Sequence, residues 1–223
     1  MYFTKSFINK VFRLGILLTI VLILLDILTY FYYPDTVIGE IFLATREQTP
    51  LTWVSAIILF LIALSSATVY MKNKGMLWYF ISIIFLFFSM DDATYFHERF
   101  SSALQELIPL LASFPSYSWI ILYLPLLVFS LGALIFLLWK NASPKEKRLL
   151  RIAFFALAVS LLLDMVDGWV GKDRTLVFCL ESRCDSIVEH FFRLLEESLE
   201  VFGFGILAYL NINKHTIISE FDS

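Results

Sequence analysis

The sequence predicts an all-α protein, a polytopic transmembrane bundle of six helices whose amino and carboxyl termini are both cytoplasmic. Hydrophobic residues make up 59% of the chain and the mean hydropathy is +0.79, so most of the surface is expected to face lipid. Apolar segments of membrane-spanning length recur along the whole chain, which we read as one transmembrane domain, residues 1–223. The expected spans are residues 12–33, 50–71, 75–97, 117–139, 149–171 and 190–212.

The first two spans are long apolar segments. Asp26 is the one acid in the first of them, and the TYFYYPD sequence at 29–35 lacks the small-residue cleavage site of a secretory signal. We therefore expect a retained anchor. A short interfacial helix is expected at 36–45, before the uncharged second span.

The third span ends in the sequence SMDDATYFHE. If this helix runs straight, Asp91, Tyr95 and Glu98 lie along one stripe. Leucine and isoleucine at helical spacing then predict a helix on the outer surface at 103–112, before the uncharged fourth span.

The fifth and sixth spans each offer only twelve consecutive apolar residues, at 152–163 and 201–212. Such a helix covers roughly 18 Å of a hydrocarbon core roughly 30 Å thick. Both helices must therefore extend through acidic residues to complete a span. The acids placed inside the membrane in this way are Asp164, Asp167, Glu196, Glu197 and Glu200.

Basic residues set the orientation. With the amino terminus inside, eleven Lys and Arg residues fall on the cytoplasmic side and five on the outer side. The buried acids then lie in the outer half of the bilayer. Cys179 and Cys184 share an outer loop, where an oxidising compartment would permit a disulfide. Such a pair could also bind a metal, but two outward-facing thiols more often form a disulfide.

Counting residues along the spans predicts two polar layers. Asp26, Asp91, Asp164 and Glu200 come out about 20–23 Å above the inner face. Straight helices would place His97, Glu98, Glu189 and His190 roughly 10–15 Å higher. Like charges in a low dielectric cannot all ionise, so the acids need protons, a bound cation or a basic partner such as Arg193.

Imidazole and carboxylate groups together form the ligand set of zinc, iron and manganese. The expected ligands of a divalent metal are His97, Glu98, His190 and Glu197, while Asp91, Asp92 and Glu200 are candidate catalytic groups acting as general base or additional ligand. No HExxH or CxxC spacing occurs, so this hypothesis rests on co-location alone.

Three runs carry a resemblance to a known group: TREQTPLTW at 45–53, SMDDATYFHE at 89–98 and EESLE at 196–200. With them the chain resembles a widespread, uncharacterised group of bacterial multi-pass inner-membrane proteins. The resemblance implies a bacterial origin and a location in the cytoplasmic (inner) membrane, where the basic residues place the acidic site on the outer side. It directs attention to the polar residues of these motifs, Asp91, Asp92, His97, Glu98, Glu196, Glu197 and Glu200. It implies no activity.

Three function classes stay open. The leading hypothesis is a metal-binding site that acts on a lipid or lipid-linked substrate. The second is a proton- or cation-handling transporter component, and the third is a scaffold or subunit whose acids hold helices or a partner together. Membrane lipids are the expected partners, no nucleic-acid patch occurs, and the oligomeric state is left open.

Overall fold

The computed structural model describes residues 5–33, 36–43, 49–108, 119–140, 142–172 and 187–221. All regular structure in these ranges is α-helical. The helices are α1 (Lys5–Tyr32), α2 (Val37–Phe42), α3 (Pro50–Asn73), α4 (Met76–Thr94), α5 (Phe96–Leu107), α7 (Trp119–Trp139), α8 (Pro144–Lys172) and α9 (Ile187–Phe221).

The helices confirm the all-α class and match the expected spans closely, with α2 at the position of the first interfacial helix. Within the described residues, four helices are long and apolar enough to cross a membrane, namely α1, α3, α4 and α8. An apolar stretch of α7, Tyr123–Trp139, is shorter. Cys179 and Cys184 lie outside the described residues.

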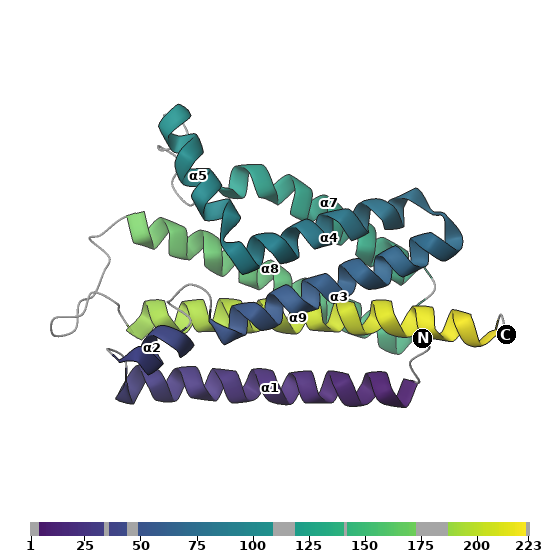
Figure 1. The fold of residues 1–223 in the computed structure, drawn as a ribbon, viewed down its shortest axis with the longest axis horizontal. Coiled ribbons are helices and arrows are strands. Elements are labelled where there is room, and N and C mark those ends of the chain that lie inside the picture. Colours follow the sequence, from purple (N-terminus) through teal and green to yellow (C-terminus); the bar gives the residue numbers. More distant parts are fainter. Residues whose placement is uncertain are drawn as a thin grey trace.

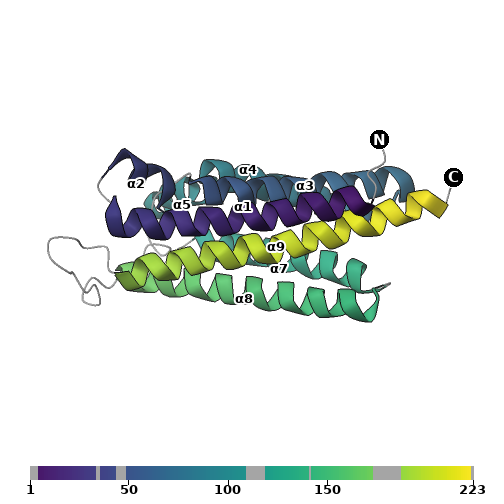
Figure 2. The same ribbon diagram turned by 90° about the horizontal axis from the view of Figure 1, so that it is seen from below.

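Helix α9 occupies the middle of the bundle and packs against α1, α3, α7 and α8. Figure 1 shows α1 along one side of α9, while α3 and α4 form an antiparallel pair on the other. Seen from below in Figure 2, α9 lies between α1 and α8. Helix α1 begins and α9 ends at one end of the bundle, which we call the termini end (Figure 1).

Local sequence signals account for several helix ends. Thr49 caps α3 by accepting a hydrogen bond from the Thr52 amide at 3.4 Å, with a proline at the first helical position. Ser143 and Glu146 form a capping box at α8: the Ser143 amide donates to Glu146 Oε2 at 2.7 Å, and the Glu146 amide donates to Ser143 Oγ at 3.4 Å. Polar residues in the linking sequences therefore fix where these apolar helices start.

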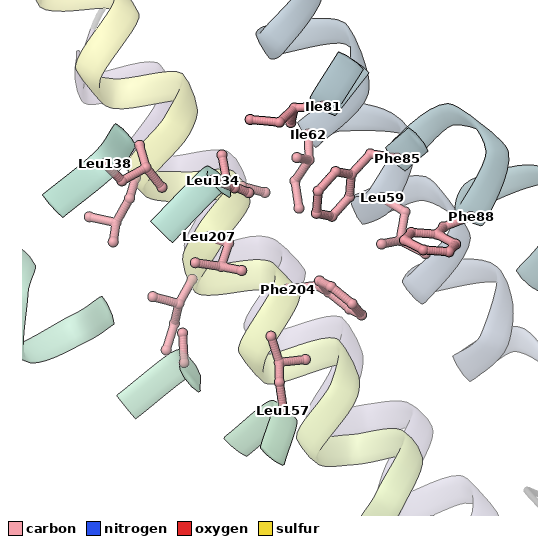
Figure 3. Packing of buried hydrophobic residues seen from close by; sticks show 14 of the residues in the cluster. Leu59, Ile62, Ile81, Phe85, Phe88, Leu134, Leu138, Leu157, Phe204 and Leu207 are labelled. Atoms are coloured by element: carbon pink, nitrogen blue, oxygen red, sulfur yellow. The ribbon is translucent and has the colours of Figure 1, made fainter. Parts of the chain in front are cut away.

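An apolar core fills the bundle on the termini side of the acids. Figure 3 shows Phe85, Phe204 and Leu207 together with Ile62 in its centre. Phe204 follows Glu200 by about one helical turn toward the termini end. This core separates the acidic half of the bundle from the termini end.

The two long helices α8 and α9 approach closely at Gly203. A Cβ atom added there would lie 2.6 Å from Leu157 Cγ and 3.2 Å from the Ala153 carbonyl oxygen. The glycine is therefore required by packing. Its neighbour Gly205 has nothing nearer than 3.9 Å.

Candidate functional site: a carboxylate cluster flanked by two histidine–aspartate pairs

A cluster of carboxylates lies where α3, α4, α8 and α9 meet, away from the termini end. Four acids from three helices make up this carboxylate cluster: Asp92, Asp164, Glu197 and Glu200. Glu197 and Glu200 lie three residues apart on α9 and therefore share one face of that helix. Of the acids expected to share one layer, Asp164 and Glu200 are members of this cluster, whereas Asp26 and Asp91 are each paired with a histidine.

Ser55 of α3 links two members of the carboxylate cluster. Its hydroxyl donates to Glu200 Oε1 at 3.4 Å and also interacts with the side chain of Asp92. Because one hydroxyl reaches both groups, the carboxyls of Asp92 and Glu200 lie close together although they come from different helices. The sequence analysis missed Ser55, since a serine in an uncharged span gives no signal of its own.

One oxygen of the cluster is buried without a hydrogen-bond partner. Asp92 Oδ2 is inaccessible and meets no donor among the described residues. A buried carboxylate oxygen that lacks a donor is costly. Protonation or a bound cation would remove that cost.

Electrostatic interactions extend through the cluster. Glu197 interacts with Glu200, Asp164 and Asp26, and with the guanidinium of Arg193. The surrounding helices desolvate the carboxyl groups of Glu197 and Glu200, although part of each residue remains accessible, so both residues are half-buried as a whole. A single guanidinium cannot neutralise four carboxylates, so the cluster carries excess negative charge whenever all are ionised.

The first histidine–aspartate pair joins Asp91 to His97. The His97 amide donates to Asp91 Oδ1 at 2.8 Å. His97 Nδ1 lies within hydrogen-bonding distance of Asp91 Oδ2, also at 2.8 Å. Tyr123 of α7 donates its hydroxyl to Asp91 Oδ1 at 3.2 Å. The His97 ring packs edge-on to Trp119 at 4.8 Å between ring centroids. Backbone, carboxylate and two aromatic rings thus hold the imidazole in one place.

The end of helix α4, which Tyr95 caps, produces this pairing. Tyr95 has a left-handed conformation, φ 52°, and its amide bonds to the Asp91 carbonyl, which ends α4 at Thr94. The expected continuous helix over 75–97 is therefore wrong in its last turn, and α5 starts at Phe96 rather than near 103. The turn brings His97 back beside Asp91 instead of one layer above it.

The second pair joins α9 to α1. His190 Nε2 lies 2.7 Å from Asp26 Oδ1, and both side chains are fully enclosed. The ring of Tyr30 stacks on His190 with centroids 4.0 Å apart. The expected height difference of 10–15 Å between the histidine and aspartate layers is therefore wrong for both pairs. For the first pair the reason is that α4 ends at Thr94. For the second pair the reason is that α1 and α9 run antiparallel, with Asp26 and His190 near the same end of the bundle.

The expected metal ligands are not assembled among the described side chains. His97 and His190 belong to separate pairs on different helices. No group of three or more His, Cys, Asp or Glu residues in the described part of the chain is arranged to hold a metal ion. The side chains of Glu98 and Asp167 lie outside that part, and Glu196 is half-buried on α9. The set of His97, Glu98, His190 and Glu197 stays a prediction.

A further buried polar group lies toward the termini end of α9. Asn211 donates its side-chain amide to Ser65 Oγ at 2.7 Å and to Ser66 Oγ at 3.1 Å, both on α3. Two helices are thereby linked by hydrogen bonds in an otherwise apolar region. The asparagine inside the mainly apolar stretch 201–212 was the available sequence signal, but it was not among the predicted site residues.

This arrangement of carboxylates and imidazoles supports proton transfer and the binding of cations. Carboxylates close together exchange protons or bind cations, and an imidazole oriented by a carboxylate accepts a proton or ligates a metal through its other nitrogen. Asp26, Asp91 and His190 are buried in the helical bundle, whereas the acids of the carboxylate cluster remain partly accessible. Fold and site together define an all-α protein of membrane type with a buried, acid-rich polar cluster.

The chain belongs to the family described as Domain of unknown function (DUF8692), whose match covers residues 14–212. The matched range includes all four acids of the carboxylate cluster and both histidine–aspartate pairs. No curated protein and no solved structure matches the chain. The family description assigns no activity, so the proposal of function rests on the site.

Proposed function

We propose that this protein binds a divalent cation in the carboxylate cluster and uses it in chemistry on a lipid or lipid-linked substrate. The observation that carries the proposal is the pair Asp92 and Glu200, held together by Ser55, with a buried oxygen of Asp92 that has no hydrogen-bond donor among the described residues. A cation between these carboxylates would satisfy that oxygen and offset the negative charge that Arg193 leaves uncompensated.

The ligand types narrow the choice of metal. Carboxylate oxygens dominate the cluster, and His97 interacts electrostatically with Glu200. Oxygen ligands suit manganese or iron better than zinc, which favours more nitrogen or sulfur ligands. A bound cation would act as a Lewis acid or activate a water molecule, with Glu200, Asp91 or Asp92 as general base.

The membrane setting is part of the proposal. Six spans, including α7 with its shorter apolar stretch and the acid-containing α9, would place both termini in the cytoplasm of a bacterial cell. Basic residues at the termini end support this orientation, because Lys72, Lys74 and Lys140 follow or precede spans there. The carboxylate cluster would then face the outer leaflet of the cytoplasmic membrane, within reach of lipid substrates.

Proton or cation transport is the second candidate. The Asn211 group supports it, because polar atoms recur along the α3–α9 interface beyond Glu200. Between the two polar regions lie Ile62, Phe204 and Leu207, each at most 4% exposed (Figure 3). This apolar barrier disfavours a continuous path and makes binding the better supported function.

Elemental analysis of the detergent-purified protein, prepared without chelator, tests the proposal. The variants are Asp92→Asn with Glu200→Gln, and Glu106→Gln as a control that removes an exposed acid on α5. Near-stoichiometric manganese or iron in the wild type and the control, with loss in the double variant, is expected. Metal-free wild-type protein that still elutes as a folded species after manganese and iron are supplied would overturn metal binding and leave proton handling.

A further inference from the structure

A pocket of about 400 Å³ lies on α1 close to the termini end. Among the side chains that the structure describes, Ser6, Asn9, Lys10 and Arg13 line it. These positions follow the spacing i, i+3, i+4 and i+7, so all four side chains share one face of the helix. Two cations and two neutral hydrogen-bonding groups therefore converge on one hollow.

The packing of Asn9 leaves its donors for the pocket. Tyr209 of α9 donates its hydroxyl to Asn9 Oδ1 at 3.0 Å, and the Tyr209 ring packs on Phe12 with centroids 4.5 Å apart. Because the amide oxygen is engaged with α9, the orientation of the Asn9 amide is fixed and its NH₂ group is the part that serves as donor. The pocket thus combines oriented neutral donors with the positive charges of Lys10 and Arg13.

An exposed apolar stripe continues from the pocket along α1. Leu14, Leu17 and Val21 follow Lys10 at helical spacing and are 65%, 58% and 42% exposed. A polar, cationic hollow above an exposed apolar stripe matches the two parts of a phospholipid, its headgroup and its acyl chain.

We propose that this pocket binds the phosphate of an anionic phospholipid, whose acyl chain lies along the apolar stripe of α1. Arg13 supplies paired donors that fit phosphate oxygens, and Lys10 supplies a second positive charge. Ser6 and Asn9 complete the coordination with neutral donors. The pocket is at the opposite end of α1 from Asp26. The proposal of lipid binding therefore does not depend on whether the carboxylate cluster binds a cation.

Native mass spectrometry of the detergent-purified full chain tests this site, with added phosphatidylglycerol, phosphatidylcholine or inorganic phosphate as probes. Replacing both cations, Lys10→Gln with Arg13→Gln, should weaken phosphatidylglycerol retention by about 30-fold. The matched control, Lys72→Gln with Lys74→Gln, removes two exposed cations at the same end of the bundle and should retain the lipid as the wild type does.

A third variant keeps both charges. Ser6→Phe places a bulky ring at the pocket without changing the positive charge that orients the span, so it tests the site even if the charge variants fail to insert. It should also lose phosphatidylglycerol. Equal retention by the wild type and Ser6→Phe, an equal loss in the Lys72, Lys74 control, or equal retention of phosphatidylcholine would overturn the proposal. Displacement of the lipid by millimolar inorganic phosphate would assign the pocket to free phosphate instead.

Discussion

Replacing Gly203 by alanine tests the close approach of α8 and α9, which positions Asp164 opposite the α9 acids. The added Cβ would meet Leu157 at 2.6 Å to Cγ and 2.9 Å to Cδ2, and the backbone oxygen of Ala153 at 3.2 Å. The branch atom of Leu157 and a carbonyl oxygen cannot both move away without shifting α8. Overpacking of this kind costs about 1–3 kcal/mol.

Gly205→Ala is the matched control, two residues along the same helix. Its added Cβ would make ordinary contacts, at 3.9 Å to Ile58 and 4.0 Å to Phe12. Alanine is favoured over glycine in a helix, so this variant should be neutral or more stable by up to about 1 kcal/mol. Both substitutions add the same methyl group, and only the surroundings differ.

Reversible unfolding in a titration of sodium dodecyl sulfate, followed by circular dichroism, gives the free energy of unfolding for each variant. A third protein, Gly203→Ala with Leu157→Ala, removes the clashing side chain. Its loss of stability should be smaller than the sum of the two single losses, because the methyl group then fills space that leucine vacated. The reasoning fails if Gly203→Ala is as stable as Gly205→Ala, or if the double variant shows simple additivity.

Three further substitutions probe the polar contacts, each by the same unfolding titration. Asp91→Asn should lower the free energy of unfolding by about 1–3 kcal/mol because it weakens two 2.8 Å contacts with His97. Tyr123→Phe removes one 3.2 Å contact with Asp91 and should cost about 1 kcal/mol or less. Equal losses would contradict the central role of Asp91. His190→Leu should destabilise by about 3 kcal/mol, and adding Asp26→Leu should recover much of that loss because the buried pair is then removed as a unit; an additive second loss would refute this. Asn211→Leu should cost about 1 kcal/mol by removing the hydrogen bonds to α3, and a neutral effect would show that they contribute nothing.

Hydropathy and length predicted most of the fold. A twelve-residue apolar run is too short to cross a membrane, and this argument placed Asp164, Glu197 and Glu200 inside the bundle before any contact was known. In the structure Asp164, Glu197 and Glu200 interact with one another and with Asp92, whereas Glu196, which the same reasoning placed inside, is not a member of this cluster, and the side chain of Asp167 lies outside the described residues.

Local backbone conformation was the part that could not be predicted. A left-handed residue that ends a helix is commonly glycine, and Tyr95 carries no such signal. Depth counted along a straight helix therefore placed His97 too far from Asp91. Partners from other helices, such as Ser55 and Tyr123, were out of reach for the same reason, because one sequence gives the face of a helix but not what it packs against.

The position of α9 explains how a membrane protein of this size carries so many acids. Within the described residues α9 is not among the four helices that are apolar and long enough to span a membrane by themselves, yet it lies in the middle of the bundle. An acid on α9 faces Ser55 or Arg193 of the protein rather than acyl chains. The free-energy cost of burying that acid therefore depends on the helices around it. Helices α1, α3 and α8 have the apolar surface that lipid requires, and α9 has the polar groups that their packing shields. The polar groups that the other helices contribute, such as Asp92 and Asp164, therefore gather beside α9. Any change that opens the α8–α9 contact should disturb both stability and the proposed cation binding.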